Sequence, residues 1–191
     1  MPANRIVFTV TLGELAEVPG SPFAYWAPES LRRLFKKFPP LDRDVAGMPD
    51  QPKIADVKVG LQTSDDLRFT RYWWEVPVEQ IAASREETRR GKKWVPFAKG
   101  GRPFYHDIAL LVNWGNDGEE IRSFPKAVIR NEAFYFRPGL AWALIESSSR
   151  MDAFLVPRGC VYSHAAHAVF IDSNVSYWRL MGIFNSVMLK S

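Results

Sequence analysis

Residues 85–102 form the most strongly charged segment of the sequence. The segment holds seven basic and two acidic residues, a net charge of +5 within a chain whose overall charge is +4. Four aromatic residues lie in or just after it, at Trp94, Phe97, Phe104 and Tyr105. Basic groups beside rings suit phosphate contact and base stacking. The alternative is a solvated helix face followed by a strand whose rings belong to the core.

Cys160, His164 and His167 form a Cys-x3-His-x2-His cluster. A zinc site needs four ligands, or three with a water molecule, and no second group of Cys or His completes this one. A thiol nucleophile with a histidine base would need a lowered thiolate pKa, which the preceding turn, Pro157-Arg158-Gly159, does not indicate. We therefore expect these residues to be structural, and no metal site in the chain.

A second arrangement is typical of metal-dependent nucleases. Pro49-Asp50 followed by Asp56-Val57-Lys58 would supply two carboxylates for a divalent cation and a lysine near the attacking water. The spacing is cramped, and Pro-Asp in a proline-rich loop is common. An autonomous nuclease built on Asp50, Asp56 and Lys58 stays open as an alternative function.

No other catalytic motif occurs. The sequence contains no G-x-G-x-x-G, no G-x-x-x-x-G-K-[ST] and no G-x-S-x-G. We therefore expect no catalytic residue and no cofactor-binding residue in this chain.

Composition indicates a folded protein of many short elements. Of 191 residues, 47% are hydrophobic and 14% aromatic, and 14 prolines and 12 glycines are spread along the chain. The single cysteine permits no internal disulfide, and no stretch reaches the roughly 20 apolar residues of a membrane span. We expect a cytoplasmic protein with no membrane contact, whose basic balance favours an anionic partner.

The predicted fold is α+β, a strand-rich mixed or antiparallel sheet with a few peripheral helices, in one domain over residues 1–191. Periodicity predicts helices at 28–38, 78–90 and 176–189, the second closed by Gly91. The last pattern runs to Lys190-Ser191 without a stop signal, so we expect the chain to be a fragment of a longer one. Strands are predicted at the following ranges: 5–12, 56–61, 67–76, 107–114, 134–137, 141–146, 152–156 and 168–172.

Six strings in order carry a family resemblance. They are GLQTSDDLRFTRYWWEV at 60–76, WVPFAKGG at 94–101, LVNWGNDG at 111–118, IRN at 129–131, FRPGLAW at 136–142 and PRGCVYS at 157–163. Together they resemble the target-recognition region of large adenine-specific DNA methyltransferases, including fused restriction–modification and phage-exclusion enzymes. The resemblance runs from about Phe23 to the last residues.

In that family the region follows a methyltransferase core that uses S-adenosylmethionine and flips the target adenine out of the duplex. The core's hallmarks, Asn-Pro-Pro-Tyr/Phe and Phe-x-Gly-x-Gly, do not occur here. The resemblance therefore implies a non-catalytic DNA-binding specificity domain. Its partners would be double-stranded DNA and a methyltransferase core in the same parent chain, with S-adenosylmethionine bound by that core. A protein-interaction domain with a basic face is the remaining alternative.

A recognition domain must hold phosphates and read base edges. Lysines and arginines are candidates for phosphate contact, and asparagines and arginines for two-pronged base contact. The candidate DNA-binding residues are Thr63, Ser64, Arg68, Arg71, Lys92, Lys93, Lys99, Arg102, Asn113, Asn116, Arg130 and Asn131.

Structural roles are the alternatives for several of these residues. Arg130 and Asn131 could cap a turn, and Asn116-Asp117-Gly118 is a strong hairpin-turn signal. The tryptophans of the strings are expected in the core rather than as stacking platforms, at Trp73, Trp74, Trp114 and Trp142.

Overall fold

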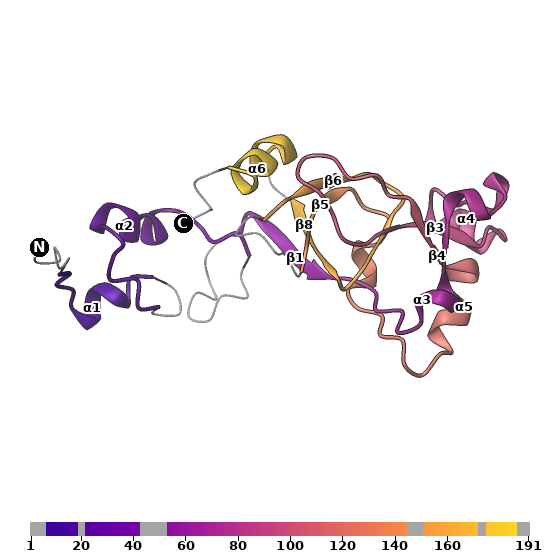
Figure 1. Ribbon diagram of the computed structural model, residues 1–191, viewed down its shortest axis with the longest axis horizontal. Coiled ribbons are helices and arrows are strands. Elements are labelled where there is room, and N and C mark those ends of the chain that lie inside the picture. Colours follow the sequence, from indigo (N-terminus) through magenta and orange to yellow (C-terminus); the bar gives the residue numbers. More distant parts are fainter. Residues whose placement is uncertain (1–6, 19–21, 43–52, 145–150, 172–174, 187–191) are drawn as a thin grey trace, which may run out of the picture. The chain divides into compact units, whose positions relative to one another are not determined.

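The computed structural model describes residues 7–18, 22–42, 53–144, 151–171 and 175–186. The chain divides into two compact units, residues 1–56 and residues 57–191 (Figure 1). The single recognition domain over residues 1–191 stays a prediction.

Unit 1 holds two helices, α1 (Leu12–Leu15) and α2 (Glu29–Lys37). The predicted helix at 28–38 is confirmed. Its buried residue is Arg32, whose guanidinium donates to the backbone of Ala27 at 2.6 Å and to Glu14 on α1 at 3.0 Å. A buried arginine is tolerated here because a carboxylate and a carbonyl replace its water.

The strand predicted at 5–12 is wrong for the residues that are described. Residues 7–11 form no strand, and α1 begins at Leu12. Thr11 and Glu14 explain the change: the Thr11 hydroxyl accepts from the backbone N–H of Glu14 at 3.2 Å, and the Glu14 carboxylate accepts from the backbone N–H of Thr11 at 2.6 Å. This capping box starts a helix where the alternating pattern would continue a strand.

Two four-stranded sheets organise the rest of the chain, and the predicted α+β class is confirmed. In the first sheet β5 (Gly139–Ala143) is antiparallel to both of its neighbours, β6 (Phe154–Val156) and β8 (Ala166–Ile171). The outer strand beyond β8 is β1 (Ala55–Val59). Four of the predicted strands, at 56–61, 141–146, 152–156 and 168–172, correspond to these elements.

The second sheet has the order β2-β4-β3-β7. β4 (Leu110–Asn113) is one of its two inner strands and pairs antiparallel with β2 (Thr70–Tyr72) and β3 (Trp94–Ala98). β3 pairs parallel with β7 (Val161–Tyr162), so this sheet is mixed. β7 and β8 follow each other in the chain and link the two sheets.

Short helices surround the second sheet (Figure 1). α4 packs against α5, α5 against β4, and α3 against β2. The helices of unit 2 are α3 (Asp66–Phe69), η1 (Trp73–Glu75), η2 (Val78–Gln80), α4 (Arg85–Arg89), α5 (Gly115–Arg122), η3 (Glu132–Phe134) and α6 (Tyr177–Phe184).

Three predicted elements differ from the structure. The strand at 67–76 is β2 only, because Asp65 caps α3 before it by accepting from the backbone N–H of Arg68 at 3.1 Å. The helix at 78–90 is two short helices, because the Ser84 hydroxyl starts α4. Gly91 closes α4 with a φ of 104°, as predicted. Residues 134–137 form no strand and hold the end of η3.

The apolar cores lie under both sheets. Trp114 is fully buried and packs edge to face against Tyr135, with the ring centroids 5.3 Å apart. Its predicted place in the core is confirmed. Trp142 is half-buried against Phe184. Trp73 and Trp74, predicted in the core, are exposed, because β2 ends at Tyr72 and η1 turns them outward.

Within the described ranges, no helix is both long enough and apolar enough to cross a membrane.

Candidate nucleic-acid interface

The loop, helix and strand at 62–72 place two arginines beside β4. Asp65 caps α3, which carries Arg68, and the chain then enters β2, where Arg71 lies opposite Leu111 of β4. Lys93 precedes β3, and its neighbour Trp94 lies opposite Asn113 at the end of β4. Residues far apart in the sequence therefore meet at one end of this sheet.

Glu120 on α5 is the point where three predicted DNA-binding residues converge. Its carboxylate accepts from the Asn113 amide at 2.6 Å, and lies 3.4 Å from Arg68 and 3.6 Å from Lys93. Burial raises the pKa of Glu120, but the Asn113 hydrogen bond and the two cations outweigh it and hold that pKa below its usual value. The carboxylate is therefore ionised at neutral pH and offsets the charge of both cations.

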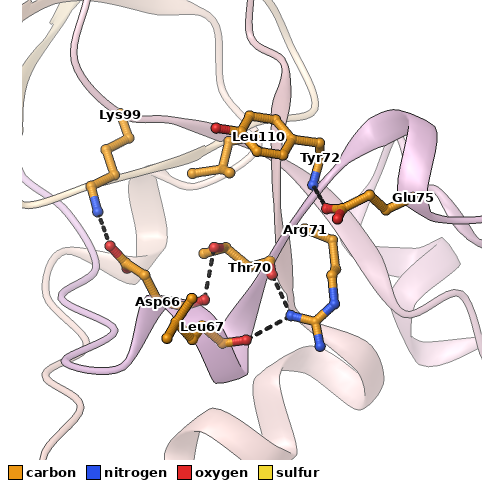
Figure 2. A pocket seen from close by; sticks show the side chains of 8 residues that line it. All are labelled: Asp66, Leu67, Thr70, Arg71, Tyr72, Glu75, Lys99 and Leu110. Carbon is orange, nitrogen blue, oxygen red and sulfur yellow. Dashed lines mark hydrogen bonds and ion pairs between the residues drawn. The ribbon is translucent and has the colours of Figure 1, made fainter.

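An adjoining pocket of about 450 Å³ lies beside α3 and β2 (Figure 2). Lys99 forms an ion pair with Asp66 on one side of it, and the Thr63 hydroxyl donates to the same carboxylate. Burial raises the pKa of Asp66, but the hydrogen bonds from Lys99 and Thr63 lower it by more. The pKa of Asp66 is therefore below its usual value.

Arg71 lies on the other side of this pocket. Its Nη1 donates to the backbone carbonyls of Leu67 at 2.7 Å and Thr70 at 2.6 Å. Its guanidinium also lies 5.8 Å from the Trp94 ring. No carboxylate pairs with it in the part of the chain that the structure describes. Backbone carbonyls, and not an acidic side chain, thus hold Arg71 beside the pocket.

The start of α5 has an unusual backbone. Asn116, Asp117 and Gly118 have positive φ values of 49°, 57° and 83°, where a hairpin turn was the structural alternative. Asp117 fixes this turn: its carboxylate accepts from Arg89 at 2.8 Å and from the Trp114 indole at 3.2 Å. The turn sets the direction of α5, and therefore the position of Glu120 over Asn113.

The amino-acid sequence of this chain is similar to parts of two larger proteins. No protein-family model matches the chain. It is 32% identical over 178 residues to adenine-specific methyltransferase BrxX of Escherichia coli O9:H4 (strain HS), which covers 91% of this chain and 13% of that protein. It is 28% identical over 196 residues to adenine-specific methyltransferase PglX of Lacticaseibacillus casei (strain Zhang), 97% of this chain and 16% of that protein.

The chain is similar to one segment of adenine-specific methyltransferases. It spans about one-seventh of the length of these relatives. The resemblance stated from the sequence is confirmed at this level. Its finer part, that the segment recognises the DNA target, stays a prediction.

In the structure, most of the basic residues of the charged segment at 85–102 are paired with acidic side chains. Six of its seven basic residues form ion pairs, four of them with acidic residues outside the segment. Arg85, for example, contacts both Asp117 and Glu132, at 3.3 Å and 2.7 Å. The net charge of +5 is therefore largely neutralised within the fold. Arg102 is exposed and has no recorded ion pair among the described residues.

The other predicted residues lie in several places. Lys92 pairs with Glu87 at 3.2 Å, and Asn116 donates to Glu119 at 2.9 Å. Asn131 has a left-handed φ of 50° and donates to the Val59 carbonyl at 2.9 Å, the structural role that was its alternative. Two more are exposed: Ser64, which accepts from the Gln62 amide, and Arg130.

Sequence reasoning missed Glu120, Asp66 and Tyr72. Arg68 and Glu120 are 52 positions apart, and a carboxylate is not a residue type that phosphate binding suggests, so the sequence carried no signal for that contact. Tyr72 did have one, because it precedes two tryptophans.

Two of the residues considered for other chemistry, Cys160 and Asp56, have structural settings. Burial raises the pKa of the Cys160 thiol to about 12, which disfavours the thiolate. Asp56 pairs with Lys53, and Asp50 lies outside the described residues. Across the described ranges, no group of three or more His, Cys, Asp or Glu side chains is placed to hold a metal ion.

Proposed function

We propose that this chain is the DNA-binding specificity segment of an adenine-specific DNA methyltransferase. The observation that carries the proposal is its similarity, over 91% and 97% of its length, to a segment of two proteins named as adenine-specific methyltransferases. The chain has neither Asn-Pro-Pro-Tyr/Phe nor Phe-x-Gly-x-Gly. In this proposal the remainder of the parent chain binds S-adenosylmethionine and performs the methyl transfer.

The geometry at the end of the β2-β4-β3 sheet supports a surface for the DNA backbone. Arg68, Arg71 and Lys93 lie on neighbouring elements around β4. Arg71 has an unneutralised guanidinium, and Arg68 and Lys93 share one carboxylate that phosphates could replace. Guanidinium groups match phosphate oxygens through paired hydrogen bonds. These three residues are the proposed phosphate contacts.

Asn116, which is exposed, is the proposed base-reading side chain, whereas Asn113 is buried and its amide is bonded to Glu120. Both line a polar pocket of about 340 Å³ together with Lys93, Glu119 and Glu120. An asparagine amide can bond two atoms of an adenine edge, and a carboxylate can accept from the cytosine amino group. The pocket therefore offers donors and acceptors of the kinds that distinguish bases.

Fluorescence anisotropy with a labelled mixed-sequence duplex tests the proposal. Three phosphate contacts predict a salt slope of about −2.7, which is a roughly 40-fold loss of affinity between ~50 and ~200 mM salt. Arg68→Gln should reduce that slope by about 0.9, while Arg33→Gln on α2 of unit 1 should leave it unchanged. Binding that is absent at ~50 mM salt, or that is insensitive to salt, would overturn the proposal.

A further inference from the structure

Three exposed aromatic rings lie at the end of β2 and in the turn that follows it. Tyr72, Trp73 and Trp74 are 48%, 53% and 59% exposed. The rings of Tyr72 and Trp74 are parallel, with centroids 4.6 Å apart and an interplanar angle of 7°, and Trp73 stands at 84° to Trp74. Large rings exposed together mark a surface that binds something.

The turn that carries these rings is held at both ends. The Glu75 carboxylate accepts from the backbone N–H of Tyr72 at 2.6 Å, and the backbone N–H of Trp73 donates to Ala109 at 3.0 Å. The rings are thus presented by an ordered segment of backbone, and a ligand would not have to order it.

Arg71 supplies a positive charge directly before the rings. Its Nη1 is occupied by the carbonyls of Leu67 and Thr70, while Nε and Nη2 have no recorded partner in the described part of the chain. Those two nitrogens form the edge of the guanidinium that binds a phosphate through two hydrogen bonds. The contacts of Nη1 fix the side chain before any anion arrives.

The pocket of Figure 2 brings Arg71 beside the first of these rings, Tyr72, while Trp73 and Trp74 are not among its lining residues. Arg71 and Tyr72 both line it, and its volume of about 450 Å³ is in the range of small-ligand sites, roughly 300–1,000 Å³. Two carboxylates also line it. Asp66 is paired with Lys99, and Glu75 caps Tyr72, so Arg71 is the cation left for an anionic ligand.

We propose that Tyr72, Trp74 and Arg71 form a subsite for one unpaired nucleotide of a DNA strand. The base stacks on the Tyr72–Trp74 pair, and its phosphate binds the outer edge of Arg71. Base stacking on aromatic side chains tolerates any base, but a paired duplex does not expose a base face. The subsite therefore acts where the DNA is opened. The inference rests on the proposed function only in taking DNA as the partner.

Opened DNA is what an enzyme that modifies a base must create, because the target nucleotide has to leave the stack. A platform on the recognition segment would hold an unpaired nucleotide close to the contacts around Glu120. Arg68 and Arg71, on α3 and β2, connect the two regions.

The test compares a single-stranded 15-mer with a duplex of the same sequence, by anisotropy. Trp74→Ala should weaken binding of the single strand by about tenfold, within the range for losing one base stack, and change duplex binding by less than about twofold. Trp74→Phe, which restores a flat ring, should recover most of the loss. Trp178→Ala is the matched control, since Trp178 on α6 is 65% exposed and is not part of the stacked Tyr72–Trp74 pair.

Glu75→Gln separates a binding role from a structural one. Glutamine keeps an acceptor for the Tyr72 N–H but removes a negative charge beside Arg71, so single-strand affinity should rise by about twofold or more. If Glu75 served only to hold the turn, Glu75→Gln would instead lower the affinity for the single strand.

The outcomes distinguish this inference from the proposed function. Wild-type protein that binds the duplex but not the single strand overturns the subsite and keeps the proposed function, and the reverse result overturns the proposed function alone. Wild-type protein that binds neither the duplex nor the single strand overturns both the subsite and the proposed function. Equal losses for Trp74→Ala and Trp178→Ala, or an unchanged single-strand affinity in Trp74→Ala, would assign the rings to another partner, such as a protein surface.

Discussion

Glu120→Gln should tighten the binding of duplex DNA. Glu120 neutralises Arg68 at 3.4 Å and Lys93 at 3.6 Å, and both pairs are about half exposed. A phosphate must compete with that carboxylate for the two cations. Exposed pairs are worth about 0.2–1 kcal/mol each, so removing two should release about 1 kcal/mol, or roughly a fivefold gain in affinity. Glutamine keeps an acceptor for the Asn113 amide, so α5 should stay in place.

The assay is fluorescence anisotropy with one duplex at ~50 and ~200 mM salt. Glu79→Gln is the control, because Glu79 is exposed on η2 and lines neither of the two pockets, and the affinity of this variant should change by less than about twofold. Thermal melting should show that both variants are folded. Affinity that is unchanged or weaker in a folded Glu120→Gln protein would refute the reasoning, because the carboxylate would then not compete with DNA.

Two further predictions concern stability. Trp114→Ala should lower the free energy of unfolding by about 3–5 kcal/mol, since it empties a fully buried site; a loss under about 1 kcal/mol in urea denaturation would contradict the described core. Burial raises the pKa values of Asp117 and Glu132, but their arginine partners lower both below the ordinary 3.8 and 4.5. Stability from these groups is present above those ordinary values and is lost as pH falls through the lowered ones, because the unfolded chain binds the protons first. Urea denaturation from pH 7 to pH 3 should show that loss, and it should be smaller in an Asp117→Asn, Glu132→Gln double variant.

Periodicity predicted two of the longer helices. The apolar spacing at 28–38 gave α2, and the pattern at 176–189 gave α6, which the structure describes as Tyr177–Phe184. Other patterns, including the one at 78–90, failed where a single side chain decided the outcome. Asp65 and Ser84 each start a helix by accepting one backbone hydrogen bond, and Ser84 with Glu87 had the capping-box spacing that signals such a start.

The candidate interface was only partly predictable. The sequence shows which residues are charged, but it does not show which of them pair with acidic residues elsewhere in the fold. Lys99 was a reasonable phosphate contact by type, yet it pairs with Asp66, 33 positions away. Arg71 looked no different from Arg68 in sequence, but Arg71 is held by backbone carbonyls and Arg68 shares a carboxylate. Such pairing depends on which strands meet, and single-sequence patterns do not specify it.

The exposure of Trp73 and Trp74 was also not predictable from the sequence pattern. Three successive aromatics in a strand pattern favour the core, and the pattern of residues 67–76 gave no reason to end the strand at Tyr72. The backbone of η1 turns Trp73 and Trp74 outward instead.

Exchange of this segment between methyltransferases tests the central claim most directly. The segment would replace the matching one in the E. coli relative, and the methylated adenines of a host genome would be mapped by single-molecule sequencing. If the segment determines specificity, the hybrid enzyme should methylate adenine in a different DNA sequence from its parent. A hybrid that methylates the parent's sequence with undiminished activity would contradict the account.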